Sequence, residues 1–297
     1  MQVRFFAAIA FNNSINKLPE NNRKEFEMRC EYVNRVLFAT FVMFTISAAT
    51  LFAKSDQAPF PKGEITRIAI GSCAKQWQHQ PIWDAVIDAQ PDLFLFLGDA
   101  IYADTDGKTA WSVTEGQLKG EWNRLAGKVG GHLPDDDSGK TLLGDTQWRW
   151  LEQQLKLQAE VRLVASSIQI IPDQKGMDEW GNFPLERKKL FDLIDRTGAK
   201  GIILLSGNVH FAELSKTDAG DYPLFELTSS GMTHINKTYA AAPNAYRVKG
   251  PFTGTHFGVV EIDWGSKPAP LINLKIISAD GDGEISHIIS LGNISKD

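Results

Sequence analysis

Residues 201–210 read GIILLSGNVH, an apolar run that stops at Ser206 and continues with an amide and an imidazole. An apolar run without alternation is typical of a β-strand that is covered on both faces, as in the sheets of α/β proteins. If the chain stays extended beyond this run, Asn208 and His210 project to the same side, because side chains alternate along a strand. The stretch therefore predicts a buried strand that delivers two polar groups to the edge of a sheet.

Similar runs recur on both sides of this stretch. Those that read as strands are RIAIG (67–71), LFLFLG (93–98), VRLVASS (161–167), YPLFELTSSG (222–231), HFGVVEIDW (256–264) and LINLKIIS (271–278). Segments with helical spacing lie between them at 82–90, 144–157 and 185–198. Asp145 is the expected N-cap of the second helix, and Gly198 is expected to close the third. Alternating strands and amphipathic helices predict a layered α/β domain over residues 65–290.

The composition limits the classes of function that the chain can have. It has 297 residues, of which 43% are hydrophobic, and a formal net charge of −5. No Lys/Arg-rich segment is present, so the sequence predicts no nucleic-acid-binding patch. The sequence also lacks a Walker loop, a G-x-G-x-x-G pattern and a G-x-S-x-G elbow. Any affinity for a phosphate group must therefore be local.

The N-terminal part of the chain predicts export. Arg29 and Arg35 flank the uncharged run 36–53, which ends in small residues, and this pattern is typical of a signal peptide over 28–53. The run is also long enough to stay as a membrane anchor, and we favour cleavage over anchoring. Met28 stands where a signal peptide would begin, so we interpret residues 1–27 as an over-long start. Residues 54–64 then form a linker, and the rest of the chain is expected to act outside the cytoplasm.

Polar side chains follow three of the predicted strands. Cys73 comes after the first, Asp99 and Tyr102 after the second, and Asn208 and His210 after 201–207. Each has an ordinary structural explanation, since a lone Cys is usually a core residue and Asp or Asn often forms a turn. However, ligands of α/β sheets bind at the carboxyl ends of the strands, and this mixture of donors suits a metal ion. The joint placement therefore predicts a metal site.

Seven short motifs occur in a characteristic order along the chain. They are GSC (71–73), PDLFLFLGDAIYAD (91–104), LLGDTQWRWLEQQL (142–155), VRLVASS (161–167), EWGNFPLERKKLFDLI (179–194), LLSGNVHFAELS (204–215) and ELTSSGMTH (226–234). This series resembles the PhoD-like alkaline phosphatases and phosphodiesterases, within the metallophosphatases, over about residues 65–265. The resemblance implies an αββα sandwich with a metal site at the strand ends, and export to the periplasm or cell surface.

The resemblance also implies a ligand set and a reaction. Cys73, Asp99, Tyr102 and His210 would hold an iron, and Asp99 would bridge it to a calcium. Asn208 stands where many family members carry an Asp that binds the second metal. Asp99, Asn208 and His210 would then be catalytic residues of a phosphoesterase in which a metal-activated hydroxide attacks a phosphate ester substrate.

One departure from the family pattern lies in residues 104–142. Family members carry here a longer segment with a WDDHD-like motif, which this sequence lacks. We interpret the gap as an internal deletion, natural or introduced by a faulty gene model, in an irregular part of the domain. The first-metal site is expected to survive, whereas the second-metal site loses a ligand. The alternative function is therefore a degenerate, non-catalytic family member, a binding or structural protein with at most one metal.

Sequencing the N-terminus of the exported protein checks the leader hypothesis. We expect the first residue to lie beyond the run 36–53, because the small residues at its end form the cleavage site. Retention of 36–53 in a membrane fraction would indicate an anchor instead. Recovery of any residue from 1–27 would contradict the start at Met28.

Overall fold

The computed structural model describes residues 3–8, 64–100, 102 and 141–295, and its strands form two sheets. The predicted leader, nearly all of the linker 54–64 and of the segment 104–142 therefore lie outside the described residues. No helix within the described ranges has both the length and the apolar character needed to cross a bilayer.

A six-stranded sheet contains the apolar run that precedes Asn208 and His210, which forms strand β5. Its order is β1 (Val3–Ala8), β4 (Val161–Ser166), β5 (Ile202–Ser206), β7 (Leu224–Ser229), β6 (Ala212–Thr217) and β8 (Arg247–Phe252). The first four strands are parallel, and β6 runs antiparallel to both of its neighbours. All five residues of β5 are buried, as its uninterrupted apolar run predicts.

A five-stranded sheet packs against the first. Its order is β11 (Gly283–Ser290), β10 (Leu271–Ser278), β9 (His256–Asp263), β2 (Arg67–Gly71) and β3 (Leu93–Phe96). Strands β2 and β3 are parallel, and the remaining pairs are antiparallel. Ile68 and Ile70 of β2 enter the large core that also contains Leu204 of β5. The apolar faces of the two sheets therefore share one core.

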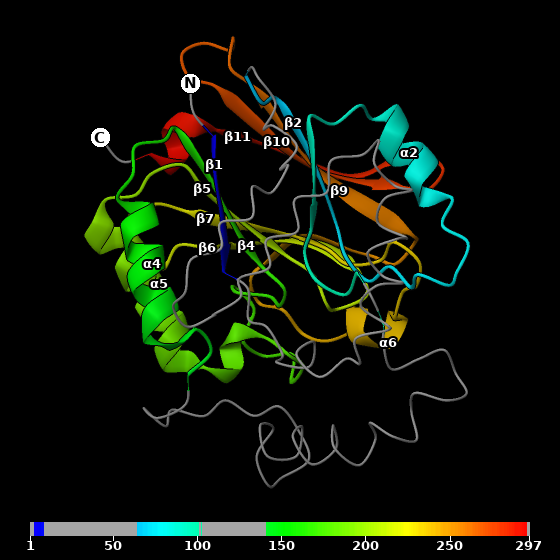
Figure 1. Ribbon diagram of the computed structural model, residues 1–297, viewed down its shortest axis with the longest axis horizontal. Coiled ribbons are helices and arrows are strands. Elements are labelled where there is room, and N and C mark those ends of the chain that lie inside the picture. Colours follow the sequence, from blue (N-terminus) through cyan, green and yellow to red (C-terminus); the bar gives the residue numbers. More distant parts are fainter. Residues whose placement is uncertain (1–2, 9–63, 101, 103–140, 296–297) are drawn as a thin grey trace, which may run out of the picture.

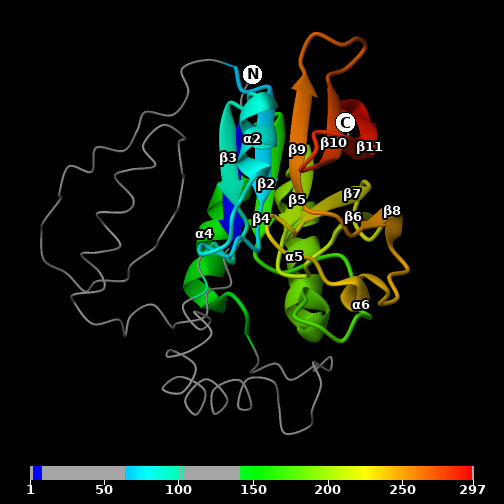
Figure 2. The same ribbon diagram turned by 90° about the vertical axis from the view of Figure 1, so that its right-hand side faces the viewer.

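Helices cover the outer faces of both sheets (Figures 1 and 2). Helices α4 (Gly144–Leu155) and α5 (Pro184–Thr197) bury Leu151, Leu190 and Leu193 in the large core. Helix α2 (Ile82–Asp88) places Ile82 and Val86 in a second cluster with Ala69, which faces away from Ile68 and Ile70. The predicted αββα layering is thus confirmed. Short helical segments are α6 (Lys237–Ala240), η2 (Trp180–Asn182) and η3 (Leu291–Ile294).

The helix ends match the sequence analysis in one case and differ in another. Gly198 closes α5 with a left-handed backbone (φ 64°), as predicted. Asp145, however, is not an N-cap. Helix α4 begins at Gly144, so Leu143 takes the cap position. The carboxylate lies in the first turn instead, where it interacts favourably with the helix dipole.

Strand β1 lies within residues 1–27, which the sequence analysis assigns to an over-long start. It pairs in parallel with β4 over six residues and forms one edge of the six-stranded sheet. A chain that begins at Met28 would lack this strand and end the sheet at β4. The start at Met28 stays a prediction.

His256, at the start of β9, ties the two sheets together. Its Nδ1 faces Gly254 O at 2.7 Å, and its Nε2 accepts the N–H of Ser230, just beyond β7, at 3.0 Å. The imidazole is therefore neutral, with its hydrogen on Nδ1. Complete burial lowers its pKa from 6.5 to about 4, so the folded state resists protonation of this ring.

His256 makes stability depend on pH. Its pKa is lower in the folded state, so its contribution is complete above the unfolded value near 6.5 and is lost as the pH falls toward 4. We expect the wild type to lose about 2 kcal/mol more than His256→Asn between about pH 7 and pH 5. Urea unfolding at both pH values measures this difference, and equal losses would contradict it.

Candidate metal centre

The ends of four strands, two from each sheet, bring the candidate residues together. Cys73 follows β2, Asp99 follows β3, His210 follows β5, and His234 follows β7. The segment after β5 passes close to the segments after β2 and β3 at Gly207. Only glycine fits there, because a Cβ would lie 2.4 Å from Ser72 Oγ and 2.9 Å from Leu97 O. The carboxyl ends of parallel strands are the expected place for a ligand site.

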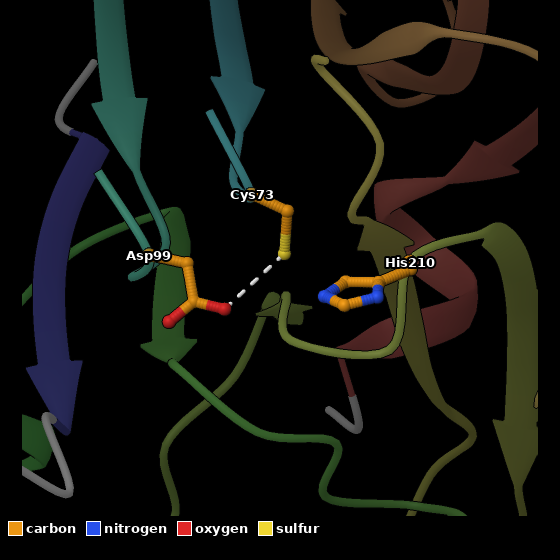
Figure 3. A group of neighbouring side chains, drawn as sticks. All are labelled: Cys73, Asp99 and His210. Atoms are coloured by element: carbon orange, nitrogen blue, oxygen red, sulfur yellow. Dashed lines mark hydrogen bonds between the residues drawn. The ribbon is translucent and has the colours of Figure 1, made fainter. Parts of the chain in front are cut away.

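Three predicted ligands point toward one another (Figure 3). One ligand atom of each of Cys73, Asp99 and His210 lies within 4.8 Å of the other two. The Cys73 thiol lies 3.4 Å from Asp99 Oδ2, and the Tyr102 hydroxyl donates to the same oxygen at 3.2 Å. Four of the five predicted site residues therefore meet at one place.

The backbone at the site is strained. The φ angles of Cys73, Asp99, Asn208 and His210 are 61°, 50°, 70° and 61°, so all four adopt the left-handed region. Among the described non-glycine residues with positive φ, only Gln90 lies outside the predicted site. Each such residue costs about 1–3 kcal/mol, and this kind of strain concentrates at functional sites. The distribution is a second observation, separate from the side-chain contacts, that favours a functional role for these strand ends.

The left-handed angles also correct the expectation for Asn208 and His210. Strand β5 ends at Ser206, so the two residues lie in a turn and the alternation of an extended chain does not apply. The turn still brings His210 to Cys73 and Asp99. For Asn208 the structure provides a strained, half-buried position beside the centre, and its role as a ligand stays a prediction.

Ser230 holds two of these residues in place. Its hydroxyl accepts the main-chain N–H of His210 at 2.9 Å and lies 3.0 Å from Cys73 Sγ. The main-chain N–H of Ser230 is in turn held by His256. Sequence analysis did not assign Ser230 to the site, because the strand predicted there extends to residue 231, whereas β7 ends at Ser229 and leaves Ser230 just beyond a strand end.

Burial sets the protonation states of the donor groups. Burial, reinforced by the charge of Asp99, raises the pKa of the Cys73 thiol to about 12. Burial and the neighbouring Cys73 and Asp99 raise the pKa of Tyr102, and burial lowers the pKa of His210. A cation would favour the thiolate and phenolate forms, which suit trivalent iron together with a carboxylate and an imidazole. The donor set therefore fits the implied metal.

Three side chains around the centre were missed by sequence analysis. His234 Nε2 lies 3.3 Å from His210 Nε2. The Lys75 ammonium lies 5.9 Å from the centre of the Tyr102 ring, and Trp77, 45% exposed, meets the same ring edge-on. His234 could have been found from its place after β7, but a search for ligand spacing along the sequence does not detect partners on other strands.

Comparison with known proteins supports the motif resemblance. The sequence model of the family described as PhoD-like phosphatase matches residues 121–247, which confirms the resemblance that the motifs indicate. No curated protein matches the chain.

Two solved structures are similar in fold. One is a structure of PhoD, with 10% identity and a TM-score of 0.44, over 78% of this chain and 73% of that one. Another is GAP50, the anchor in the inner membrane complex of Plasmodium, with 12% identity and a TM-score of 0.48, over 76% of this chain and 88% of that one. At these values neither similarity carries information on function.

Replacement of Ser230 tests its supporting role. We expect Ser230→Ala to destabilise the fold by about 1–3 kcal/mol, because the His210 N–H loses its acceptor. We also expect a metal affinity lower by about 10–100-fold, because the groups behind the ligands are loosened. Ser229→Ala is the matched control, since this buried hydroxyl faces Ile70 O instead. Equal metal affinity in Ser230→Ala and the wild type, measured by titration, would contradict the role.

Proposed function

We propose that this chain, which resembles the PhoD-like phosphatases, is an exported metal-dependent phosphoesterase of the alkaline phosphatase and phosphodiesterase type. The observation that carries the proposal is the convergence of Cys73, Asp99 and His210 on strained turns at the strand ends. Tyr102, which donates a hydrogen bond to Asp99, completes the donor set that the motifs imply. Export rests on the leader pattern of residues 28–53.

The proposed centre assigns a task to each side chain. Cys73, Asp99, Tyr102 and His210 would hold iron, which when bound polarises the phosphate ester and lowers the pKa of a water molecule. Asp99 Oδ2 already receives both the Tyr102 hydroxyl and the Cys73 thiol, so it is the central anchor of the set. Ser230 would act as a positioning residue, because its hydroxyl contacts Cys73 Sγ and accepts the main-chain N–H of His210.

Lys75 is suited to attract the substrate. The chain has a net charge of −5, so its overall field does not favour an anion. Burial lowers the pKa of both His210 and His234, and the nearby Lys75 charge lowers each further, although the Asp99 carboxylate acts in the opposite direction at His210. A phosphate ester at the centre would therefore meet a local positive charge.

A second candidate function is supported by the sequence itself. The chain lacks the WDDHD-like motif, and Asn208 replaces a charged ligand of the second metal. A two-metal clamp on the attacking and leaving oxygens needs both ions. A chain that holds iron but no calcium would retain the fold and one metal, as a binding or structural protein.

Metal content and turnover separate the two functions. The purified protein, incubated with iron and calcium, is expected to bind iron and to hydrolyse a chromogenic phosphodiester. Because Asp99 anchors the donor set, Asp99→Asn is expected to lower iron affinity at least about tenfold and to abolish turnover. Asp88→Asn, at the exposed end of α2, is the control and should change neither.

The remaining outcomes are also decisive. Iron binding without turnover favours the non-catalytic function. A wild type that binds no iron and shows no turnover rules out the metalloenzyme for this chain.

A further inference from the structure

His234 lies beside two predicted ligands although no motif assigns it to them. Its Nε2 is 3.3 Å from His210 Nε2 and 3.4 Å from the Tyr102 hydroxyl oxygen. It reaches this position from the loop after β7, whereas His210 comes from the loop after β5. The side chain is half-buried, so it is held among these groups but not sealed from the site.

The hydrogen bonds of Thr233 fix the tautomer of His234. The Thr233 hydroxyl lies 3.0 Å from Cys73 O, and a carbonyl oxygen only accepts, so the single hydroxyl hydrogen points there. The same oxygen accepts the main-chain N–H of Lys75 at 2.9 Å. His234 Nδ1, 3.0 Å away, must therefore donate to Thr233. In the neutral imidazole, which is the form that binds a metal, this leaves a lone pair on His234 Nε2.

Without a metal, the N–H of His210 Nε2 can donate to that lone pair at 3.3 Å, whereas the Tyr102 oxygen cannot. The Tyr102 hydroxyl gives its hydrogen to Asp99 Oδ2, so its oxygen presents no hydrogen to His234. His210 Nε2 would lose its hydrogen on binding a metal through this atom. Two imidazole lone pairs at 3.3 Å repel each other unless a cation lies between them.

We propose that His234 Nε2 is a further ligand of the same cation as His210 and Tyr102. The separation of the two nitrogens is close to what this role requires, because two metal–nitrogen bonds of about 2.1 Å at an angle of roughly 100° place the nitrogens about 3.2 Å apart. His234 lies outside the group whose ligand atoms are all within 4.8 Å of one another, so its ring must move closer to Cys73 or Asp99 when the cation binds. Thr233 then acts as the outer partner that a ligating imidazole usually has. The inference rests on the proposed metal centre and adds an imidazole to it.

X-ray absorption at the iron edge tests the proposal by counting imidazole ligands. We expect two in the iron-loaded wild type and one in His234→Ala, together with an iron affinity at least about tenfold weaker. His79→Ala, which removes an exposed imidazole, is the control and should retain two. The wild-type count needs no variant, so it stands even if His234→Ala does not fold.

The outcomes distinguish this inference from the proposed function. One imidazole in the wild type, with phosphodiester turnover intact, overturns the role of His234 and leaves the phosphoesterase standing. Unchanged iron affinity in folded His234→Ala also overturns that role. A wild type that binds no iron at all overturns both.

Discussion

The candidate centre depends on the packing of two sheets that hold strained turns in place. Left-handed backbone at Cys73, Asp99 and His210 would relax in an isolated loop, because each such residue is costly. Here each turn follows a strand fixed in the shared core. The close approach at Gly207 and the hydrogen bond from Ser72 Oγ to Ser229 O, 3.0 Å long, lock the strand ends across the sheets.

A buried network of charges supports the turn that carries His210. Glu213 of β6 pairs with Lys175 and with Arg247, whose Nε lies 2.6 Å from Glu213 Oε2. The Lys175 ammonium also lies 4.8 Å from the centre of the ring of Phe211, the residue that directly follows His210 in the chain. Buried ion pairs add little net stability, but the loss of one partner is costly. Loss of Lys175 or Arg247 alone would therefore destabilise the segment that directly follows His210.

The apolar runs and amphipathic helices were sufficient for the layered α/β class, whereas the αββα arrangement came from the family resemblance. The residues at the ends of the runs were sufficient to find four of the five candidate site residues that the structure brings together. The sequence did not reveal elements and side chains whose hydrogen-bond or ion-pair partners come from distant parts of the chain. Strand β6 was missed because its buried Glu213 and Ser215 look like surface residues until Arg247 and Asn244 pair with them. His234 was missed for the same reason. The alternation rule failed beyond Ser206 because backbone angles there are set by packing between sheets.

The origin of the donors has a consequence for folding. Cys73 and Asp99 follow strands of the five-stranded sheet, whereas His210 follows a strand of the six-stranded one. A cation shared among them would act as a clamp between the two halves of the sandwich. Free-metal concentration would then set stability by mass action, adding about 2.7 kcal/mol at a hundredfold excess over Kd. The two halves of the sandwich would therefore be held together more firmly with the metal than without it, by an amount that the metal concentration sets.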